Sequence, residues 1–223
     1  MAKKLITEAD IVAAAARGVR IIAVDAHTII TPSARDAAAR LRIPFDSQHT
    51  PSSGSSFVQS VTLHRPSGKK SKATVAIGAD HGGYAMKEQI KARLLELGYS
   101  VADAGTNSEQ PCDYPDFAYA VASLVASGEV AKGVMIDSVG VASAIVCNKV
   151  PGIRAVAAYN EFVARSSREH NDANVLTFGA KVLGIEAARS ILAVWLETWF
   201  GGGRHVARVN KITDIEQRFS KRK

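Results

Sequence analysis

Apolar and polar residues alternate in blocks along residues 73–223, and the blocks predict strands and helices in turn. Short apolar runs predict five strands, at residues 74–79, 100–104, 133–137, 153–158 and 175–178. Helical periodicity between them predicts five helices, at residues 84–97, 114–127, 141–150, 161–170 and 184–200. Regular alternation of this kind predicts an α/β fold, a Rossmann-like three-layer αβα arrangement in which helices cover both faces of a five-stranded parallel sheet.

The pattern changes before residue 73 and divides the chain into three parts. Residues 46–72 are rich in Ser, Pro, Gly and Lys and poor in periodic apolar positions, which is typical of a flexible linker. Residues 1–45 form a small α/β extension, called the head here, and residues 73–223 form the body. In the head we expect a helix at 8–17 that begins with a capping box of Thr7 and Asp10, a strand within 19–24, and a second helix that starts at Thr31-Pro32.

Composition narrows the class of protein only slightly. With 47% hydrophobic and 22% charged residues the chain is an ordinary globular protein. It contains no apolar run long enough to span a membrane and no secretory signal at its start, so a cytoplasmic location and no membrane partner are expected. Cys112 and Cys147 have no metal-ligand or redox spacing and are interpreted as free thiols.

The net charge of +7 does not indicate a nucleic-acid partner. Part of the excess lies in the stretch "GKKSK" of the linker and in "KRK" at the chain end, and no basic helix is interleaved with aromatic residues. Isolated arginines are better suited to a small anionic substrate.

Candidate chemistry follows the predicted strands, because parallel sheets bind ligands at the carboxyl ends of their strands. Asp80 and His81 follow the first strand of the body and precede Gly82 and Gly83. Glycines before a helix let a ligand approach the backbone and leave helix N–H groups free for an anion. A tight turn with a solvated Asp-His pair explains the same residues, and both interpretations stay open.

Three more stretches carry candidate groups. Asp137 ends the third strand, and the small residues after it form a nest of backbone N–H groups suited to a substrate oxygen: Ser138, Val139, Gly140, Val141 and Ala142. His170 and Asn171 stand in a polar segment before the last strand, where helix capping is the alternative role. Arg204 and Arg208, four residues apart, share a helical face that fits a phosphate or is simply solvated.

These motifs together resemble the type B ribose-5-phosphate isomerase family, which includes the galactose-6-phosphate isomerase subunits. The resemblance rests on their order and spacing: "GADHGGYAMKEQI", "DYPDFA", "NKVPGIRA", "SREHNDANVLTFG" and "GGRH". It covers about residues 73–218 and implies an aldose–ketose isomerase that needs no metal or other cofactor. It also implies a homodimer or homotetramer whose active sites are shared between subunits.

The resemblance assigns a role to each candidate residue. It implies that His81, Arg204 and Arg208 bind the phosphate and that Asp80 and His170 help to open the sugar ring. Asn171 and the backbone N–H groups of residues 138–142 correspond to groups that stabilise the enediolate. Tyr114 corresponds to a residue that lines the substrate cleft.

The sequence departs from the family at the position of the catalytic base. Many members have a cysteine where this chain has Asp137, and another branch uses a glutamate where this chain has Ser143. A carboxylate is a sufficient base for this enolisation when burial raises its pKa, as in triosephosphate isomerase, the standard example. We therefore interpret Asp137 as the base, and a helix-capping role in an altered enzyme is the alternative.

Two functional interpretations follow. The first is isomerisation of a sugar phosphate, most simply ribose 5-phosphate to ribulose 5-phosphate, although Val139 and Ala142 replace family residues and leave other tetrose, pentose or hexose phosphates open. The second is a scaffold or binding subunit that retains only sugar-phosphate recognition. The head resembles N-terminal segments of bacterial microcompartment proteins, which implies docking of residues 1–45 to a shell or to a cargo enzyme.

Overall fold

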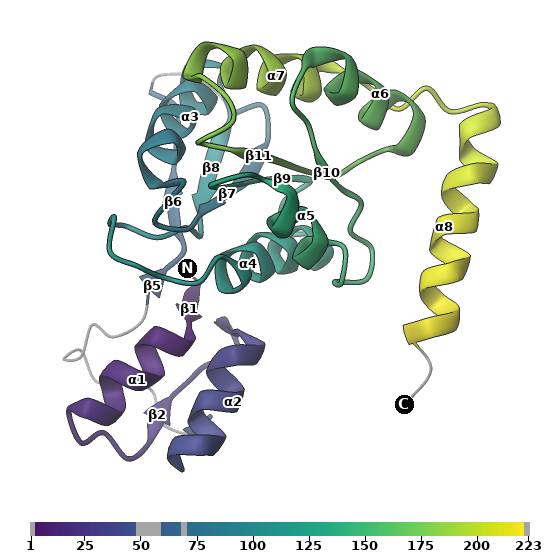
Figure 1. Ribbon diagram of the computed structural model, residues 1–223. Helices are drawn as coiled ribbons and strands as arrows, with labels where there is room; N and C mark the ends of the chain where they lie inside the picture. Colours follow the sequence, from purple (N-terminus) through teal and green to yellow (C-terminus); the bar gives the residue numbers. More distant parts are fainter. Residues whose placement is uncertain (1–2, 48–58, 68–70, 221–223) are drawn as a thin grey trace.

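A computed structural model describes residues 3–47, 59–67 and 71–220 of the chain (Figure 1). Two stretches of the predicted linker, residues 48–58 and 68–70, lie outside the described residues, so its predicted flexibility stays a prediction. The described residues form a body built on one large sheet and a smaller head beside it.

The body confirms the predicted α/β class. Five strands run parallel at its centre: β7 (Thr74–Ala79), β8 (Ser100–Asp103), β9 (Lys132–Asp137), β10 (Ala155–Ala157) and β11 (Val175–Gly179). Their order across the sheet is β10-β11-β9-β7-β8. The three central strands are buried along nearly their whole length, which is why they read as continuous apolar runs in the sequence.

The sheet has a sixth strand that the sequence analysis missed. Strand β6 (Thr62–His64) comes from the predicted linker and pairs antiparallel with β8, with Leu63 opposite Ala102. The buried Val61 precedes it, so the short alternation of apolar and polar residues in "SVTLHR" was hidden by the Ser- and Pro-rich composition around it. The prediction that the flexible linker includes residues 62–64 was therefore wrong.

Helices cover both faces of the sheet, as predicted. One face packs against α3 (Tyr84–Glu96), α6 (Glu161–Asn171) and α7 (Ile185–Glu197), in a core that contains the fully buried Trp195. The other face packs against α4 (Tyr114–Ala126) and α5 (Val141–Cys147), in a core that contains Phe117. Figure 1 shows these two layers above and below the sheet. The carboxyl ends of β7 and β9 open between them.

The last helix, α8 (Arg204–Ser220), stands apart from the layers (Figure 1). Val209 is its one buried residue, whereas Val206, Ile212, Ile215 and Phe219 are exposed. A hydrogen bond from the Gly152 N–H to Glu216 Oε2 (2.9 Å) links its last turns to the body. Within the described residues, a helix with this exposed apolar side has little of its own chain to pack against.

The head contains two helices and several short strands. Its elements are β1 (Lys4–Ile6), α1 (Glu8–Ala16), β2 (Ile22–Ala23), β3 (Thr28–Ile30), α2 (Pro32–Leu41) and β4 (Phe45–Asp46), which reaches the first residue of the predicted linker. A further strand of the predicted linker, β5 (Gln59–Ser60), pairs antiparallel with β1. The capping box of Thr7 and Asp10 is present at α1, and Thr31 caps α2 by accepting the Ala34 N–H at 3.2 Å. Leu5 of β1 belongs to the same buried cluster as Phe117 of the body, so the head packs directly against α4.

Candidate active site

Two buried carboxylates stand side by side at the carboxyl edge of the sheet. Asp80 follows β7 and Asp137 ends β9, and these strands are parallel neighbours with Ala79 opposite Ile136. Their side chains are only 6% and 4% exposed. Burying two acids together is costly unless hydrogen bonds compensate, so their partners decide what each can do.

The carboxylate of Asp137 is fully occupied by its own loop. Oδ1 accepts hydrogen bonds from the N–H groups of Val139 (2.7 Å) and Gly140. Oδ2 accepts from the N–H (3.1 Å) and the hydroxyl of Ser143. A carboxylate offers about four lone-pair sites, and all of them have donors here. Asp137 therefore anchors the turn into α5, and a proton from a ligand must displace one of these donors.

The loop that follows Asp137 depends on a glycine. Gly140 has φ 94°, a left-handed conformation that L side chains rarely adopt, and a Cβ there would lie 2.7 Å from Phe178 Cα. This turn aims the Val139 and Gly140 amides at Asp137 rather than at a ligand. Among the described hydrogen bonds the N–H groups of Ser138 and of Val141 and Ala142, in the first turn of α5, have no acceptor. They are the part of the predicted nest that is free.

Asp80 is less constrained than Asp137. Its Oδ1 accepts the Gly83 N–H at 3.0 Å. Burial raises the pKa of the Asp80 carboxyl, the negative charge of Asp137 adds to this rise, and the Gly83 N–H and His81 oppose it. The Ser138 loop lies close beside it, because a Cβ on Gly82 would come within 2.5 Å of Ser138 Oγ. Burial thus lets the Asp80 carboxyl take up a proton more readily than a free aspartate does.

His81 and Tyr114 complete this edge. Nδ1 of His81 lies 3.0 Å from the carbonyl oxygen and 3.2 Å from the amide nitrogen of Cys112, so the backbone of residue 112 fixes the orientation of the ring. Tyr114 is the first residue of α4, is partly buried, and packs against the core cluster that contains Phe117. Both predicted ligand-binding residues therefore depend on the segment that leads into α4.

The remaining predicted residues lie at the other end of the sheet. His170 and Asn171 end α6, just before β11 begins at Val175, and Val175 pairs with Gly133 near the start of β9. Four residue steps along β9 separate that row from Asp137, which is about 13 Å at the usual rise of a strand. Within one chain, the two groups of predicted residues do not meet.

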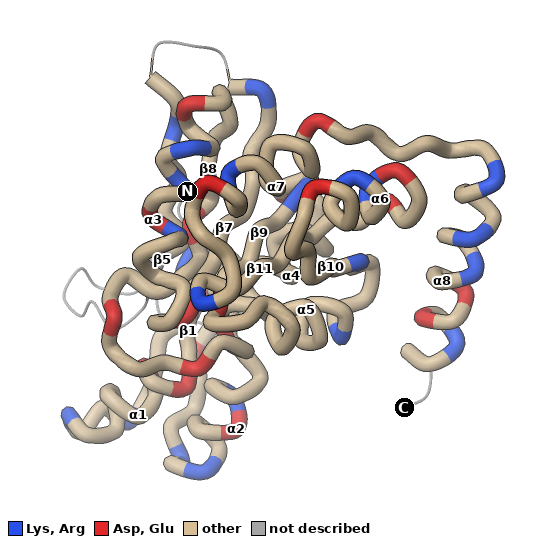
Figure 2. Tube along the Cα trace, turned by 45° about the horizontal axis from the view of Figure 1, so that its top comes forward, with Lys and Arg blue, Asp and Glu red and all other residues tan. Residues whose placement is uncertain are grey.

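His170 is held by its neighbours on α6 and α8. Its Nδ1 lies 3.1 Å from Ser166 Oγ, and its ring stacks on that of His205, with centroids 4.4 Å apart and an angle of 13°. Arg204 and Arg208 flank His205 in the first turns of α8, and both are exposed. Figure 2 shows basic residues along α8. These positive charges are free to meet an anion that approaches this end of the molecule.

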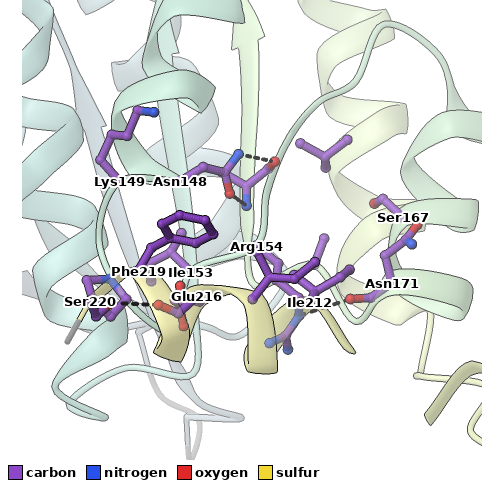
Figure 3. A pocket seen from close by; sticks show the side chains of 15 residues that line it. Asn148, Lys149, Ile153, Arg154, Ser167, Asn171, Ile212, Glu216, Phe219 and Ser220 are labelled. Atoms are coloured by element: carbon purple, nitrogen blue, oxygen red, sulfur yellow. Dashed lines mark hydrogen bonds between the residues drawn. The ribbon is translucent and has the colours of Figure 1, made fainter. Parts of the chain in front are cut away.

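A groove of about 840 Å³ lies between α8 and the body at this end (Figure 3). Arg154 lines it, a residue that the sequence analysis did not single out although it stands in the quoted stretch "NKVPGIRA". Its Nε donates to the carbonyl oxygen of Asn171 (2.9 Å), and Nη2 pairs with Asp172 (2.9 Å). Spacing along the chain did not reveal that Arg154 holds the end of α6 beside this groove, because its partners Asn171 and Asp172 are 17 and 18 residues away.

Across residues 3–47, 59–67 and 71–220, no three His, Cys, Asp or Glu side chains gather in a way that could hold a metal ion. No helix in those ranges is long and apolar enough to cross a membrane.

The fold and this edge define a class: an α/β protein that holds paired carboxylates, a histidine and open amides at the carboxyl ends of parallel strands, the usual ligand site of such sheets. The family model described as "Ribose/Galactose Isomerase" matches residues 75–212. The chain belongs to this family, and its class is that of the aldose–ketose isomerases of phosphorylated sugars.

Individual relatives agree with this assignment. The chain is 48% identical to ribose-5-phosphate isomerase B of Escherichia coli over 144 residues, which cover 65% of this chain and 97% of that protein. It is 36% identical to D-erythrulose-4-phosphate isomerase of Pectobacterium atrosepticum over 141 residues, 62% of this chain and 92% of that one. The structure of ribose-5-phosphate isomerase B from Clostridium thermocellum matches with a TM-score of 0.65 and 47% identity, over 66% of this chain and 99% of that one.

Proposed function

We propose that the protein interconverts ribose 5-phosphate and ribulose 5-phosphate, by ring opening and proton transfer between C1 and C2 through a cis-enediolate. The observation that carries this proposal is the carboxyl edge of the sheet, where Asp80 and Asp137 stand beside His81 and the open amides of α5. The names of the relatives from E. coli and C. thermocellum support the choice of substrate.

The proton acceptor in this proposal is Asp137. Three of its four donors are backbone amides fixed by the loop, but the fourth is the Ser143 hydroxyl, which can rotate away. Rotation frees one lone pair of Oδ2 for a proton from the substrate. The Val141 and Ala142 amides then stabilise the enediolate oxygen, and Asp80 and His170 exchange protons with the ring and carbonyl oxygens.

A second candidate is favoured by the same hydrogen bonds. A carboxylate held by four donors is a good structural anchor, so the protein can instead bind a sugar phosphate without isomerising it and serve as a binding or scaffold subunit. One experiment separates the two: isomerisation assays with aldose and ketose phosphates of four to six carbons, on the wild type and on Asp137→Asn. Turnover of ribose 5-phosphate that Asp137→Asn abolishes supports the first candidate. Binding without turnover of any substrate supports the second, and full activity in Asp137→Asn removes Asp137 from the role of base.

We further propose that two subunits share each active site, in a homodimer or a homotetramer. The support is the separation of roughly 13 Å along β9 between Gly133, which lies level with the end of α6 and His170, and Asp137. Because of this separation, one chain does not bring both groups to one substrate. The test mixes two inactive variants, Asp80→Asn and Arg208→Ala. A shared site regains activity when subunits exchange, since some sites receive both intact halves, whereas sites contained within one chain stay inactive.

The head is the basis of a proposal about where the protein lies in the cell. We propose that the protein is cytoplasmic and is carried into a bacterial microcompartment by residues 1–45, which lie outside the matched family region of residues 75–212. The test fuses residues 1–60 to a fluorescent protein in cells that make a shell. Diffuse fluorescence in the presence of intact shells contradicts this role.

A further inference from the structure

The head and the body meet at one buried carboxylate, that of Asp116. This residue is the third of α4, two positions after Tyr114, and is 3% exposed. Its Oδ2 accepts the N–H of Glu8 at 3.3 Å, and its Oδ1 accepts the hydroxyl of Ser33. Both donors belong to the head. A buried carboxylate needs such partners, so the head satisfies a group of the body that would otherwise need water.

Both helices of the head begin at this carboxylate. Glu8 is the first residue of α1, and Ser33 is the second residue of α2. The first turn of a helix carries unpaired N–H groups and a partial positive charge, which attract a negative group. Burial and the nearby negative charge of Asp116 raise the pKa of Asp10, a capping-box residue of α1. Asp116 therefore holds the two helices of the head against α4.

The predicted phosphate-binding residue His81 lies on the other side of this junction. A groove of about 510 Å³ separates α1 from His81 and from residues 111–113. Residue 112 orients the His81 ring through its backbone, and the same segment leads into Tyr114 and Asp116. A continuous chain of contacts thus runs from α1 and α2 through Asp116 and the start of α4 to His81.

The E. coli relative has no counterpart of this junction. The match to the E. coli protein covers 97% of that protein with 144 residues, which leaves it no room for a counterpart of the head. In this chain the head also fastens to the body by an ion pair between Lys3 and Glu129 (2.5 Å) and by the buried Leu5. These contacts fix the head against the body.

We propose that the head is a positioning element of the sugar-phosphate site, which sets the placement of His81 and Tyr114 through Asp116. The proposal rests on the proposed function in so far as a sugar phosphate is the ligand. It predicts that loosening the head weakens substrate binding more than it slows the chemical step, because His81 and Tyr114 contact the substrate while Asp80 and Asp137 are held by the sheet.

The test is Ser33→Asp in the full chain. An aspartate in the first turn favours α2 itself but places a second negative charge against Asp116, so it strains the junction without weakening the helix. We expect KM for ribose 5-phosphate to rise about fivefold or more with kcat within about twofold. Ser33→Ala, which only removes one donor, gives a smaller rise. The double variant Ser33→Asp/Asp116→Asn removes the repulsion and lowers KM again.

A matched control and a second readout keep the proposal falsifiable. Thr28→Ala removes a hydroxyl that donates to Asp25 within the head (2.8 Å), and it leaves KM unchanged. Nuclear magnetic resonance of the His81 ring reports its placement without turnover, so it decides the question even if no sugar phosphate is isomerised. We expect Ser33→Asp to shift the His81 signals and Thr28→Ala to leave them in place. A head that detaches in Ser33→Asp, as limited proteolysis would reveal, while KM and the His81 signals stay at wild-type values, overturns the proposal.

Discussion

The hydroxyl of Ser143 is the donor that most directly competes with a substrate for Asp137, and its removal tests the proposed base. Ser143 is fully buried, and its hydroxyl and its amide both donate to Oδ2 of Asp137. Ser143→Ala deletes the hydroxyl and keeps the amide. One lone pair of Oδ2 becomes free, and no new polar group is left without a partner.

The expected effects on stability and on rate have opposite signs. A hydrogen bond to a charged group contributes about 1.5–3 kcal/mol, so we expect Ser143→Ala to lower the free energy of unfolding by about 2 kcal/mol. The wild type must break this bond before Asp137 accepts a proton. The same 2 kcal/mol corresponds to a ceiling of about 30-fold on the gain in kcat. If about half of the proton transfer is complete in the transition state, the gain is about fivefold.

Urea denaturation measures the loss of stability, and steady-state isomerisation of ribose 5-phosphate measures kcat. The matched control is Ser167→Ala, which removes another buried hydroxyl that donates to the Ala164 carbonyl oxygen (2.8 Å), away from Asp137. It is expected to cost some stability without a gain in rate. If Ser143→Ala is less stable and its kcat is lower than or equal to that of the wild type, then Asp137 is not a base that must first lose its hydrogen bond to the Ser143 hydroxyl.

Three further predictions concern titratable groups in the body. Burial raises the pKa of Asp80 above 3.8, so its charge costs stability at neutral pH. Asp80→Asn is expected to melt higher than the wild type at pH 7, to lose this advantage as the pH falls from the raised pKa of Asp80 to 3.8, and to isomerise poorly. Burial, assisted by Arg168, lowers the pKa of Lys132 from 10.5 to about 8; the wild type gains stability between these pH values, and Lys132→Met loses that dependence in urea titrations. Burial raises the pKa of Cys147 to about 12 and also raises that of the half-buried Cys112, so mass spectrometry after alkylation of the native protein at pH 8 should find Cys112 slowly modified and Cys147 untouched.

The sequence predicted the layers of the body because its signals are local. Strands β7, β9 and β11 are buried on both sides and read as continuous apolar runs, and the helices between them carry the periodicity of a single buried face. Strand β6 gave no such signal, since three residues at an edge with one apolar side chain between two polar ones are too few for a pattern to emerge. Pairing with β8, 37 to 41 residues further along, is what makes it a strand.

The structure brings only some of the predicted site residues together, and the hydrogen bonds of Asp137 and of the head were not predicted. Strand ends located Asp80 and Asp137 correctly at one edge of the sheet. The partners of Asp137 depend on the left-handed turn at Gly140, and the attachment of the head depends on Asp116, more than 80 residues from its donor Ser33. Hydrogen bonds that cross such separations are products of the fold, and spacing along the chain does not encode them.

Strand β6 also determines where a shortened form of this protein should begin. Without it, β8 would be the last strand of the sheet and would present a row of unpaired N–H and C=O groups, which invites a strand from a neighbouring molecule. A shortened protein that starts at residue 73 exposes that row, and its self-association would then be mistaken for natural assembly. One that starts at Val61 keeps the edge covered. Residues 62–64, which the sequence assigned to a flexible linker, form the edge strand that protects a body prepared alone from this self-association.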